Sequence, residues 1–336
     1  MAAQMIVLVF CVAAVAALPA DTVISKLNDG PRYQYVSSGE GPKLVDTWLT
    51  SSSMARTARY APDTENVYHL FTRQNPTISQ PMLLGVPSLI AANFDPSRST
   101  VVLIHGWSSS ATSDFVVNLV PRILAAADVN VIAVDWSAGA YEPNYYSVVA
   151  NNVPLSGSSI GSFIFWLNLS TGASIATYHV IGFETGAHIA GLVGRSLGGL
   201  IPHITALEPP RPGFNLNSNA FLSTDGIFTE AMHTNAGVTG LVQPVADVDF
   251  YPNGGTTMAG CRWWDWECSR DRAYQYLGES ILTGGFTGVL CESLLEATSG
   301  SCESEETLNM GGLTAKFGSS GIYYLTTNEQ SPFSTG

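Results

Sequence analysis

The sequence predicts an α/β fold with a mostly parallel central sheet and helices on both faces. Short runs of apolar residues alternate with longer stretches in which apolar residues recur every three or four positions. The short runs are continuous, as in strands buried on both faces of a parallel sheet. Hydrophobic residues make up 46% of the 336-residue chain and charged residues 12%, so we expect a large core and no extensive disorder.

The expected elements follow one another as strand, helix, strand, helix, which is the doubly wound arrangement. The strands are residues 100–104, 129–134, 178–181 and 204–207, and the clearest helical stretches are residues 113–127 and 187–197. Ligands bind where parallel strands end. We therefore expect a site near Trp107, Gly182 and Glu208.

The amino-terminal segment predicts export. Residues 1–20 carry no charged side chain, and residues 6–18 form an apolar run of signal-peptide length that is too short to cross a bilayer. Ala17 and Ala20 offer cleavage sites; the alternative is a buried amino-terminal helix. We expect a signal peptide over residues 1–20, one domain over residues 21–336, and a secreted, extracellular protein that makes at most peripheral membrane contact.

The cysteines agree with an exported chain. Cys11 lies in the expected signal peptide, and an even number of cysteines remains: Cys261, Cys268, Cys291 and Cys302. Four cysteines allow three disulfide pairings, and proximity in the sequence favours Cys261–Cys268 and Cys291–Cys302. A zinc site is the alternative, but neither spacing is C-x-x-C and no histidine lies nearby.

Charge and motifs exclude several partners. The formal charge is −13 and no cluster of lysine or arginine occurs, which argues against nucleic acid. The glycine-rich residues 283–288 lack the lysine and the preceding strand of a phosphate loop, so we expect no cofactor and no metal. Asn168-Leu169-Ser170 is a sequon for N-glycosylation.

One turn carries most of the functional information. Gly182-Phe183-Glu184-Thr185-Gly186 follows an expected strand and opens a helix, which is the context of the nucleophile elbow G-x-S-x-G. Its glycines make room for a sharp turn that projects the central side chain, and the amide of the next residue faces a developing oxyanion. The central residue here is Glu184, so the elbow offers no hydroxyl.

With this turn, the chain resembles the secreted neutral lipases, a family that includes pancreatic triglyceride lipases, phospholipases A1 and insect yolk proteins. The resemblance runs from about residue 66 to about residue 324. It includes residues 71–76, His105-Gly106-Trp107, residues 133–136, the elbow with residues 187–191, and residues 251–255. It implies an α/β-hydrolase fold for the single domain, and we expect no carboxy-terminal β-sandwich domain.

The resemblance also places the catalytic triad. The family's acid corresponds to Glu208, in Leu207-Glu208-Pro209-Pro210, and its histidine corresponds to Arg270, which follows Cys268-Ser269. The oxyanion-hole positions are Trp107 and Thr185. Arginine stays protonated and cannot act as a general base, and loss of the serine or the histidine alone costs such an enzyme about a million-fold. We expect an inactive homologue.

The three replacements suggest a structural role. Glu184, Glu208 and Arg270 sum to one negative charge, as in an active triad at rest, and we hypothesise that Arg270 bridges the two carboxylates. The alternative is that the three side chains point separately to water. Catalysis through Thr185 or through direct attack by Glu184 is disfavoured, because Thr185 lies past the apex of the elbow and no base is present.

The segment between Cys261 and Cys268 corresponds to the lid over the acyl-binding cleft of the family. It holds Trp263, Trp264 and Trp266. Tryptophan favours lipid–water interfaces, so these rings either contact lipid or pack over the cleft and close it. We expect a pseudo-lipase that binds or stores lipid or another hydrophobic small molecule. The alternatives are a carboxylester hydrolase of low or unusual activity, of triglyceride lipase or phospholipase A1 type, and an interaction protein with a closed cleft.

Overall fold

The predicted α/β architecture is confirmed. The computed structural model describes residues 22–26, 32–36, 43–87 and 90–336, so the expected signal peptide (residues 1–20) lies outside the described residues. Within them, an eleven-stranded sheet has the order β14-β13-β15-β12-β11-β10-β9-β7-β8-β5-β6. Its strands are β5 (Val67–Phe71), β6 (Gln80–Met82), β7 (Thr100–Ile104), β8 (Asn130–Asp135), β9 (Tyr178–Phe183), β10 (His203–Leu207), β11 (Thr229–Met232), β12 (Val248–Pro252), β13 (Thr287–Cys291), β14 (Thr307–Asn309) and β15 (Gly321–Leu325).

Parallel pairing is confined to the middle of this sheet. Every neighbouring pair from β8 across to β15 is parallel, whereas β5, β6, β13 and β14 join antiparallel at the two edges. The four predicted strands are all central ones: β7 has the predicted bounds, and β8, β9 and β10 are shifted or extended by one or two residues. Strand β9 continues to Phe183, because Gly182 and Phe183 still pair with Ala206 and Leu207 of β10.

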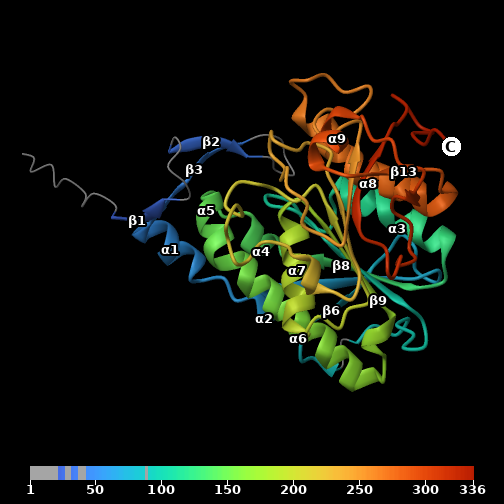
Figure 1. Ribbon diagram of the computed structural model, residues 1–336. Helices are drawn as coiled ribbons and strands as arrows, with labels where there is room; N and C mark the ends of the chain where they lie inside the picture. The colour runs from blue at the N-terminus through green and yellow to red at the C-terminus, as the bar shows by residue number, and fades with distance from the viewer. Residues whose placement is uncertain (1–21, 27–31, 37–42, 88–89) are drawn as a thin grey trace, which may run out of the picture.

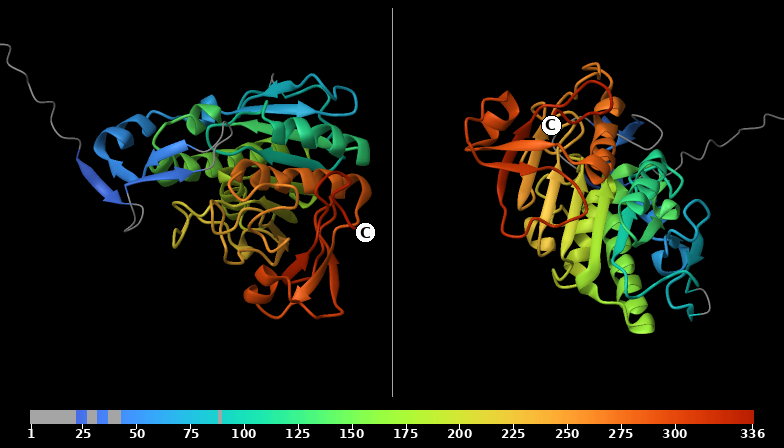
Figure 2. Two further views of the ribbon diagram at one scale, coloured as in Figure 1. Left: turned by 90° about the horizontal axis from the view of Figure 1, so that it is seen from above. Right: turned by 90° about the vertical axis from the view of Figure 1, so that its right-hand side faces the viewer.

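Helices cover both faces of the sheet (Figures 1 and 2). They are α1 (Ser51–Thr57), α2 (Pro62–Glu65), α3 (Asp114–Ala126), α4 (Ser137–Ala140), α5 (Tyr145–Ser147), η2 (Val148–Asn152), α6 (Val153–Thr171), η3 (Ile175–Thr177), α7 (Thr185–Ser196), η4 (Ser223–Asp225), α8 (Trp266–Thr283) and α9 (Leu294–Ser299). The predicted helices at residues 113–127 and 187–197 correspond to α3 and α7.

The alternation of side chains along a strand divides the core in two. Val102 and Ile104 of β7 belong to the buried cluster that includes Ile160 of α6 and Ile189 of α7. Val101 and Leu103 belong to the other cluster, with Phe115 and Leu119 of α3 and Tyr274 and Leu277 of α8. Burial on both faces explains why β7 is apolar at nearly every position.

The amino-terminal residues form a separate layer beside α5. Strand β1 (Val23–Lys26) pairs antiparallel with β4 (Trp48–Thr50), and β2 (Tyr33–Val36) pairs antiparallel with β3 (Lys43–Asp46). Figure 1 shows these strands next to α1 and α5. Val45 of β3 is buried in the same cluster as Trp107, so this layer reaches the neighbourhood of the elbow.

Both expected disulfides are confirmed. Cys261 pairs with Cys268 and Cys291 with Cys302, with Cα–Cα distances of 5.6 Å and 4.8 Å. The zinc alternative is therefore excluded for these four cysteines. Among the residues with described positions, no helix combines the length and apolarity that a bilayer crossing requires.

Candidate functional site

The elbow between β9 and α7 keeps the strained geometry of a nucleophile turn. Glu184 has φ 53° and ψ −127°, a backbone region that residues other than glycine rarely adopt. A Cβ at Gly182 would collide with the backbone of Gly186, and one at Gly186 would collide with the carbonyl of Ile104. The glycines on both sides of Glu184 are thus needed for the close approach of α7 to β7 and β9.

The Glu184 carboxylate lies on the two amides that the sequence assigns to an oxyanion hole. Its Oε2 atom accepts hydrogen bonds from Trp107 N at 2.9 Å and from Thr185 N at 2.5 Å. Oε2 also lies so close to Gly106 that a Cβ there would approach it to 2.6 Å. The side chain is 2% exposed, and Oε1 has no hydrogen-bond partner within the described residues. Two convergent N–H groups therefore hold a carboxyl oxygen that belongs to the protein itself.

Burial raises the pKa of Glu184 above its ordinary value. The hydrogen bonds from Thr185 and Trp107 and the positive charge of Arg270 oppose this shift but do not cancel it. The protonated carboxyl group is therefore favoured more at the elbow than it would be in water.

Glu208 is held in the same manner at the end of β10. Its Oε2 atom accepts hydrogen bonds from Thr234 N at 2.6 Å, Asn235 N at 2.8 Å and Thr234 Oγ1 at 3.2 Å. Its Oε1 atom is buried without a hydrogen-bond partner in the described part of the chain. Burial raises the pKa of Glu208 to about 7, against the opposing effect of the two amides. Thr234 and Asn235 were not predicted as site residues, although they lie two and three positions after the end of β11, at the edge where the site was expected.

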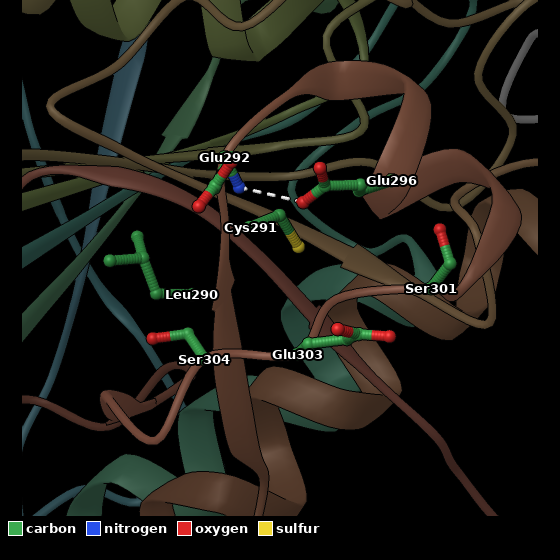
Figure 3. A pocket seen from close by; sticks show the side chains of 7 residues that line it. All are labelled: Leu290, Cys291, Glu292, Glu296, Ser301, Glu303 and Ser304. Carbon is green, nitrogen blue, oxygen red and sulfur yellow. Dashed lines mark hydrogen bonds between the residues drawn. The ribbon is translucent and has the colours of Figure 1, made fainter.

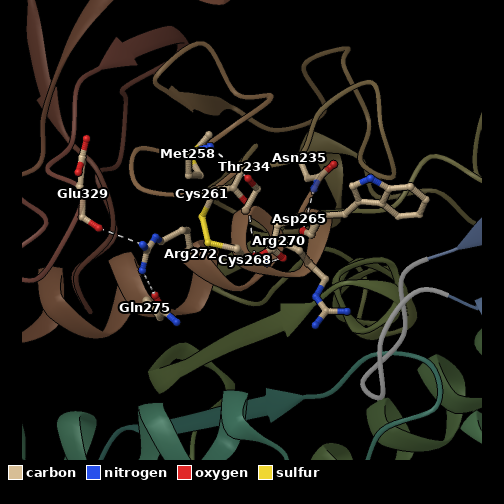
Figure 4. The surroundings of a disulfide bond; sticks show 12 residues. Thr234, Asn235, Met258, Cys261, Asp265, Cys268, Arg270, Arg272, Gln275 and Glu329 are labelled. Carbon is tan, nitrogen blue, oxygen red and sulfur yellow. Dashed lines mark hydrogen bonds between the residues drawn. A yellow bond between two sulfur atoms is a disulfide. The ribbon is translucent and has the colours of Figure 1, made fainter. Parts of the chain in front are cut away.

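Arg270 is buried on α8 but does not join the two carboxylates. Its Nε atom donates to Asp271 Oδ1 at 2.7 Å, and its guanidinium carbon lies 5.8 Å from the centre of the Phe183 ring. In Figure 4 the guanidinium group extends away from Thr234 and Asn235, whose amides hold Glu208. Burial alone would lower the pKa of Arg270, but the nearby carboxylates of Asp271, Glu184 and Glu267 together outweigh burial and raise the pKa.

The hypothesis that Arg270 bridges Glu184 and Glu208 is therefore wrong. In each carboxylate, Oε2 accepts hydrogen bonds from two backbone N–H groups. Neither carboxylate accepts a hydrogen bond from Arg270. The alternative, in which the side chains point to water, is wrong as well, because Glu184, Glu208 and Arg270 are 2%, 2% and 5% exposed. What remains between Arg270 and Glu184 is attraction between their charges.

The histidines near the elbow are all engaged elsewhere. His233 contacts Leu241 O at 3.0 Å through Nδ1 and Asp249 Oδ1 at 2.8 Å through Nε2. His188 contacts Pro210 O and accepts from Phe221 N, both at 2.9 Å. Within the described residues neither Glu184 nor Glu208 forms a hydrogen bond with a histidine, and every histidine of the chain lies in that part. Among the described residues, no histidine is therefore hydrogen-bonded to the side chain at the apex of the elbow.

Thr185 is equally unsuited to replace the serine. Its side chain is completely buried, and its hydroxyl lies 3.5 Å from the hydroxyl of Tyr145. Its backbone N–H points at Glu184 Oε2.

The disulfide-closed segment presents tryptophan to solvent. Trp263 and Trp264 are 77% and 54% exposed and pack edge to face, with ring centres 5.4 Å apart. Trp266 is half-buried at the start of α8, where its carbonyl accepts from Asn235 Nδ2 at 2.9 Å. Asn235 also donates its backbone N–H to Glu208, so the lid is connected to the second carboxylate through one residue. Two of the three rings thus face outward, which differs from the alternative of three rings packed over the cleft.

An apolar hollow lies beside Trp107. It has a volume of about 310 Å³, and its lining includes Leu44, Val45, Trp107, Tyr141 and Pro143. Residues 44 and 45 come from β3, far from the elbow in the sequence, and no local pattern pointed to them. The hollow shares Trp107 with the predicted oxyanion hole.

A second hollow, of about 730 Å³, has a different character (Figure 3). It lies beside the Cys291–Cys302 disulfide, and three carboxylates, Glu292, Glu296 and Glu303, line it. Glu296 accepts a hydrogen bond from the backbone N–H of Glu292 at 2.8 Å. This acidic lining does not suit an apolar ligand.

Comparison with known proteins identifies the family. A family model described as Lipase matches residues 33–333. The chain belongs to the lipase family. This agrees with the sheet order, the elbow and the disulfide-closed lid segment described above, and it confirms the resemblance found in the sequence.

Several relatives of this lipase-family chain are pancreatic proteins. Pancreatic triacylglycerol lipase of Sus scrofa is 31% identical over 305 residues, which cover 81% of this chain and 67% of the relative. The Homo sapiens protein of the same name is 30% identical, with coverage of 71% and 57%. Pancreatic lipase-related protein 2 of Bos taurus is 31% identical, with coverage of 71% and 56%. The matched part thus spans between 56% and 67% of the length of these relatives.

Solved structures give a weaker likeness to the lipase-family chain. Acetyl xylan esterase from Aspergillus awamori has a TM-score of 0.37 at 10% identity and covers 90% of this chain and 95% of its own. The Pyrococcus furiosus esterase Pf2001 has a TM-score of 0.28 at 22% identity, with coverage of 50% and 58%.

Proposed function

We propose that this chain is a secreted, catalytically inactive member of the lipase family that binds lipid or another hydrophobic ligand. The observation that carries the proposal is the position of Glu184 Oε2, which accepts both the Trp107 and the Thr185 amides. In an active enzyme, amides so arranged would stabilise the oxyanion of a tetrahedral intermediate. Here the chain's own carboxylate occupies them.

The missing chemistry supports the loss of activity. Acyl transfer by a serine hydrolase needs a hydroxyl nucleophile, a base that removes its proton and an oxyanion hole. Glu184 has no hydroxyl, Arg270 remains protonated, and the hydroxyl of Thr185 is buried. The residual acceleration of about 10³–10⁴ that an oxyanion hole can give without a triad also requires free amides.

The exposed lid and the apolar hollow support a ligand role. Trp263 and Trp264 present two large rings to solvent beside a closed disulfide loop. Transfer of such rings to a lipid–water interface is favourable, because the apolar ring face leaves water while the polar N–H keeps a hydrogen-bond partner. The hollow beside Trp107 offers apolar walls for part of an acyl chain. Lipid storage, the other role expected from the sequence, would use the same binding of lipid by the protein.

Secretion is supported by the two disulfides, since such bonds persist in oxidising compartments. The charge-free, apolar residues 1–20 add the sequence argument for a signal peptide. The chain would then meet its ligand outside the cell.

A second candidate function is carboxylester hydrolysis, which the names of the relatives favour. Pancreatic triacylglycerol lipases are named for such an activity, and the chain is about 30% identical to several of them. For this candidate to hold, Glu184 would have to leave both amides and an unidentified group would have to supply the base.

An ester assay tests the proposal directly. We expect purified chain to hydrolyse p-nitrophenyl butyrate and emulsified triacylglycerol no faster than buffer containing heat-denatured protein. The expected reason is that neither a nucleophile nor a base is present at the elbow. Turnover that disappears in a Glu184→Gln variant would overturn the proposal, because it would show catalysis at this site.

The ligand role predicts an effect of the lid tryptophans. Replacing Trp263 and Trp264 by alanine is expected to weaken binding to zwitterionic phospholipid vesicles about tenfold or more, because each fully buried ring contributes roughly 1.5–3 kcal/mol. Zwitterionic lipid is the suitable probe, since a chain with a formal charge of −13 is repelled by anionic vesicles. Vesicle flotation or tryptophan fluorescence measures the change.

Phe317, which is 62% exposed outside the lid, provides the matched control. Its replacement by alanine is expected to leave vesicle binding unchanged. Equal losses in both variants would mean that exposed aromatic area matters and the lid does not. Solvent extraction of the purified protein, followed by mass spectrometry, adds a second measurement. Co-purified lipid supports a cleft that binds ligand. Absence of lipid, together with vesicle binding that the replacement of Trp263 and Trp264 does not alter, supports a closed cleft.

A further inference from the structure

An apolar groove lies at the carboxyl end of α6, near the start of β9 and thus at the opposite end of that strand from the elbow. Helix α6 leads through η3 into the start of β9, whereas Glu184 follows the end of β9. The groove has a volume of about 540 Å³, and its lining includes Phe165, Leu169, Ile175, Leu197 and Leu200. We call it the α6 groove.

Large apolar side chains of the α6 groove are exposed to solvent. Phe165, Leu169 and Leu200 are 59%, 72% and 55% exposed. Helix α6 has no charged residue over its 19 positions. A contiguous apolar surface of this kind marks a site that another group covers.

Asn168 lies within this groove and is oriented for modification. Its Oδ1 atom accepts a hydrogen bond from the Tyr178 hydroxyl at 2.7 Å. That bond fixes the amide, so that Nδ2 is the free end. Nδ2 donates to none of the described residues and is not among their buried polar atoms, so it reaches solvent.

The sequence around Asn168 supplies the recognition signal. Asn168-Leu169-Ser170 is the only N-x-S/T triplet of the 336-residue sequence that lacks proline in the middle, since Asn75-Pro76-Thr77 is blocked by its proline. Ser170 is exposed. Phe165 is three residues before Asn168 on the helix, and residues at this spacing lie on one face.

We propose that Asn168 carries an N-linked glycan whose first sugar residues lie in the α6 groove. A pyranose ring presents C–H groups on one face and hydroxyl groups at its rim. It can therefore cover Phe165 and Leu169 while its polar atoms stay in water. The proposal rests on the proposed secretion, because this modification takes place in the secretory pathway.

The covalent step uses only the Asn168 amide and a polyprenyl-diphosphate-linked oligosaccharide. Nδ2 forms a bond to the anomeric carbon of the first sugar, and the bond from that carbon to the diphosphate oxygen breaks. The amide loses one proton, and the polyprenyl diphosphate departs. Oδ1 is unaltered, so its hydrogen bond with Tyr178 survives the modification.

The test compares three full-length chains expressed with their own amino-terminal segment in animal cells. Ser170→Ala removes the sequon but keeps the Asn168–Tyr178 hydrogen bond, and Ser170→Thr preserves the sequon. Chymotryptic peptides of protein from the medium are analysed before and after enzymatic N-glycan release in H₂¹⁸O. We expect ¹⁸O-labelled aspartate at position 168 in the chain without substitutions and in Ser170→Thr. We expect no such label in Ser170→Ala.

Each outcome decides the proposal. An Asn168 peptide that is unmodified in secreted protein overturns the glycan while leaving secretion intact. Protein retained in the cytosol overturns both secretion and the glycan. Coverage of the groove has its own readout, the fluorescence of an apolar dye, which should rise in Ser170→Ala and fall again when Phe165→Ser is added. Equal dye fluorescence in glycosylated and unglycosylated chains overturns the assignment of the sugar to the groove.

Discussion

A triple variant, Glu184→Ser, Glu208→Asp and Arg270→His, is expected to hydrolyse short activated esters, whereas the unmodified chain is not. Serine at position 184 would provide a hydroxyl at the strained elbow and release the Trp107 and Thr185 amides for an oxyanion. Histidine at position 270 would supply the base. Loss of either partner costs a serine hydrolase about a million-fold, so even partial recovery should raise kcat/KM for p-nitrophenyl butyrate about 10³-fold or more.

Glu184→Ser alone is the matched control for this gain. It frees the amides but leaves Arg270 in the position of the base, and we expect a rate close to that of the unmodified chain. Equal thermal unfolding of both variants would establish that they fold. A folded triple variant that is no faster than Glu184→Ser would contradict the correspondence of Arg270 with the family's histidine.

The second large effect is a loss of stability as the pH rises. The pKa of Glu208 is raised to about 7 in the folded chain, against about 4.3 for an exposed glutamate. Below about pH 4 the carboxyl is protonated in both states. Between these values the unfolded chain releases the proton and the folded chain keeps it. The contribution of Glu208 to the free energy of unfolding therefore falls by about 3–4 kcal/mol until the pH passes the folded pKa.

Glu208→Gln is expected to remove this part of the decline. The amide oxygen of glutamine can still accept from Thr234 and Asn235, while the side chain no longer ionises. Urea unfolding at pH 5, 6, 7 and 8 measures the difference, and Glu305→Gln, at an exposed position, serves as the control. The decline that remains belongs in part to Glu184, whose pKa is also raised by burial. Parallel pH profiles for the Glu208→Gln variant and the unmodified chain would contradict this account.

The sequence by itself determined the central elements of this protein. Strands β7 to β10 were predictable because burial on both faces makes them continuously apolar, a property that each segment carries alone. The elbow was predictable because its need for glycine is largely local. A Cβ at Gly182 would collide with Gly186, four residues later, and a Cβ at Gly186 would collide with the neighbouring strand. The disulfides were predictable for a similar reason: short separations of 7 and 11 residues favour closure.

Only the tertiary structure decided how the charged side chains of the site are partnered. Glu184 and Arg270 are 86 positions apart in the numbering, and opposite charge alone suggested that they pair. In the fold, the carboxylates of Glu184 and Glu208 meet backbone amides at the turns that follow β7, β9 and β11, and Arg270 turns to its own neighbour Asp271. The apolar hollow likewise needed β3 to be placed beside Trp107. Such contacts join segments that are far apart in the sequence. They depend on how those segments pack in the fold, which the local periodicity of apolar residues does not determine.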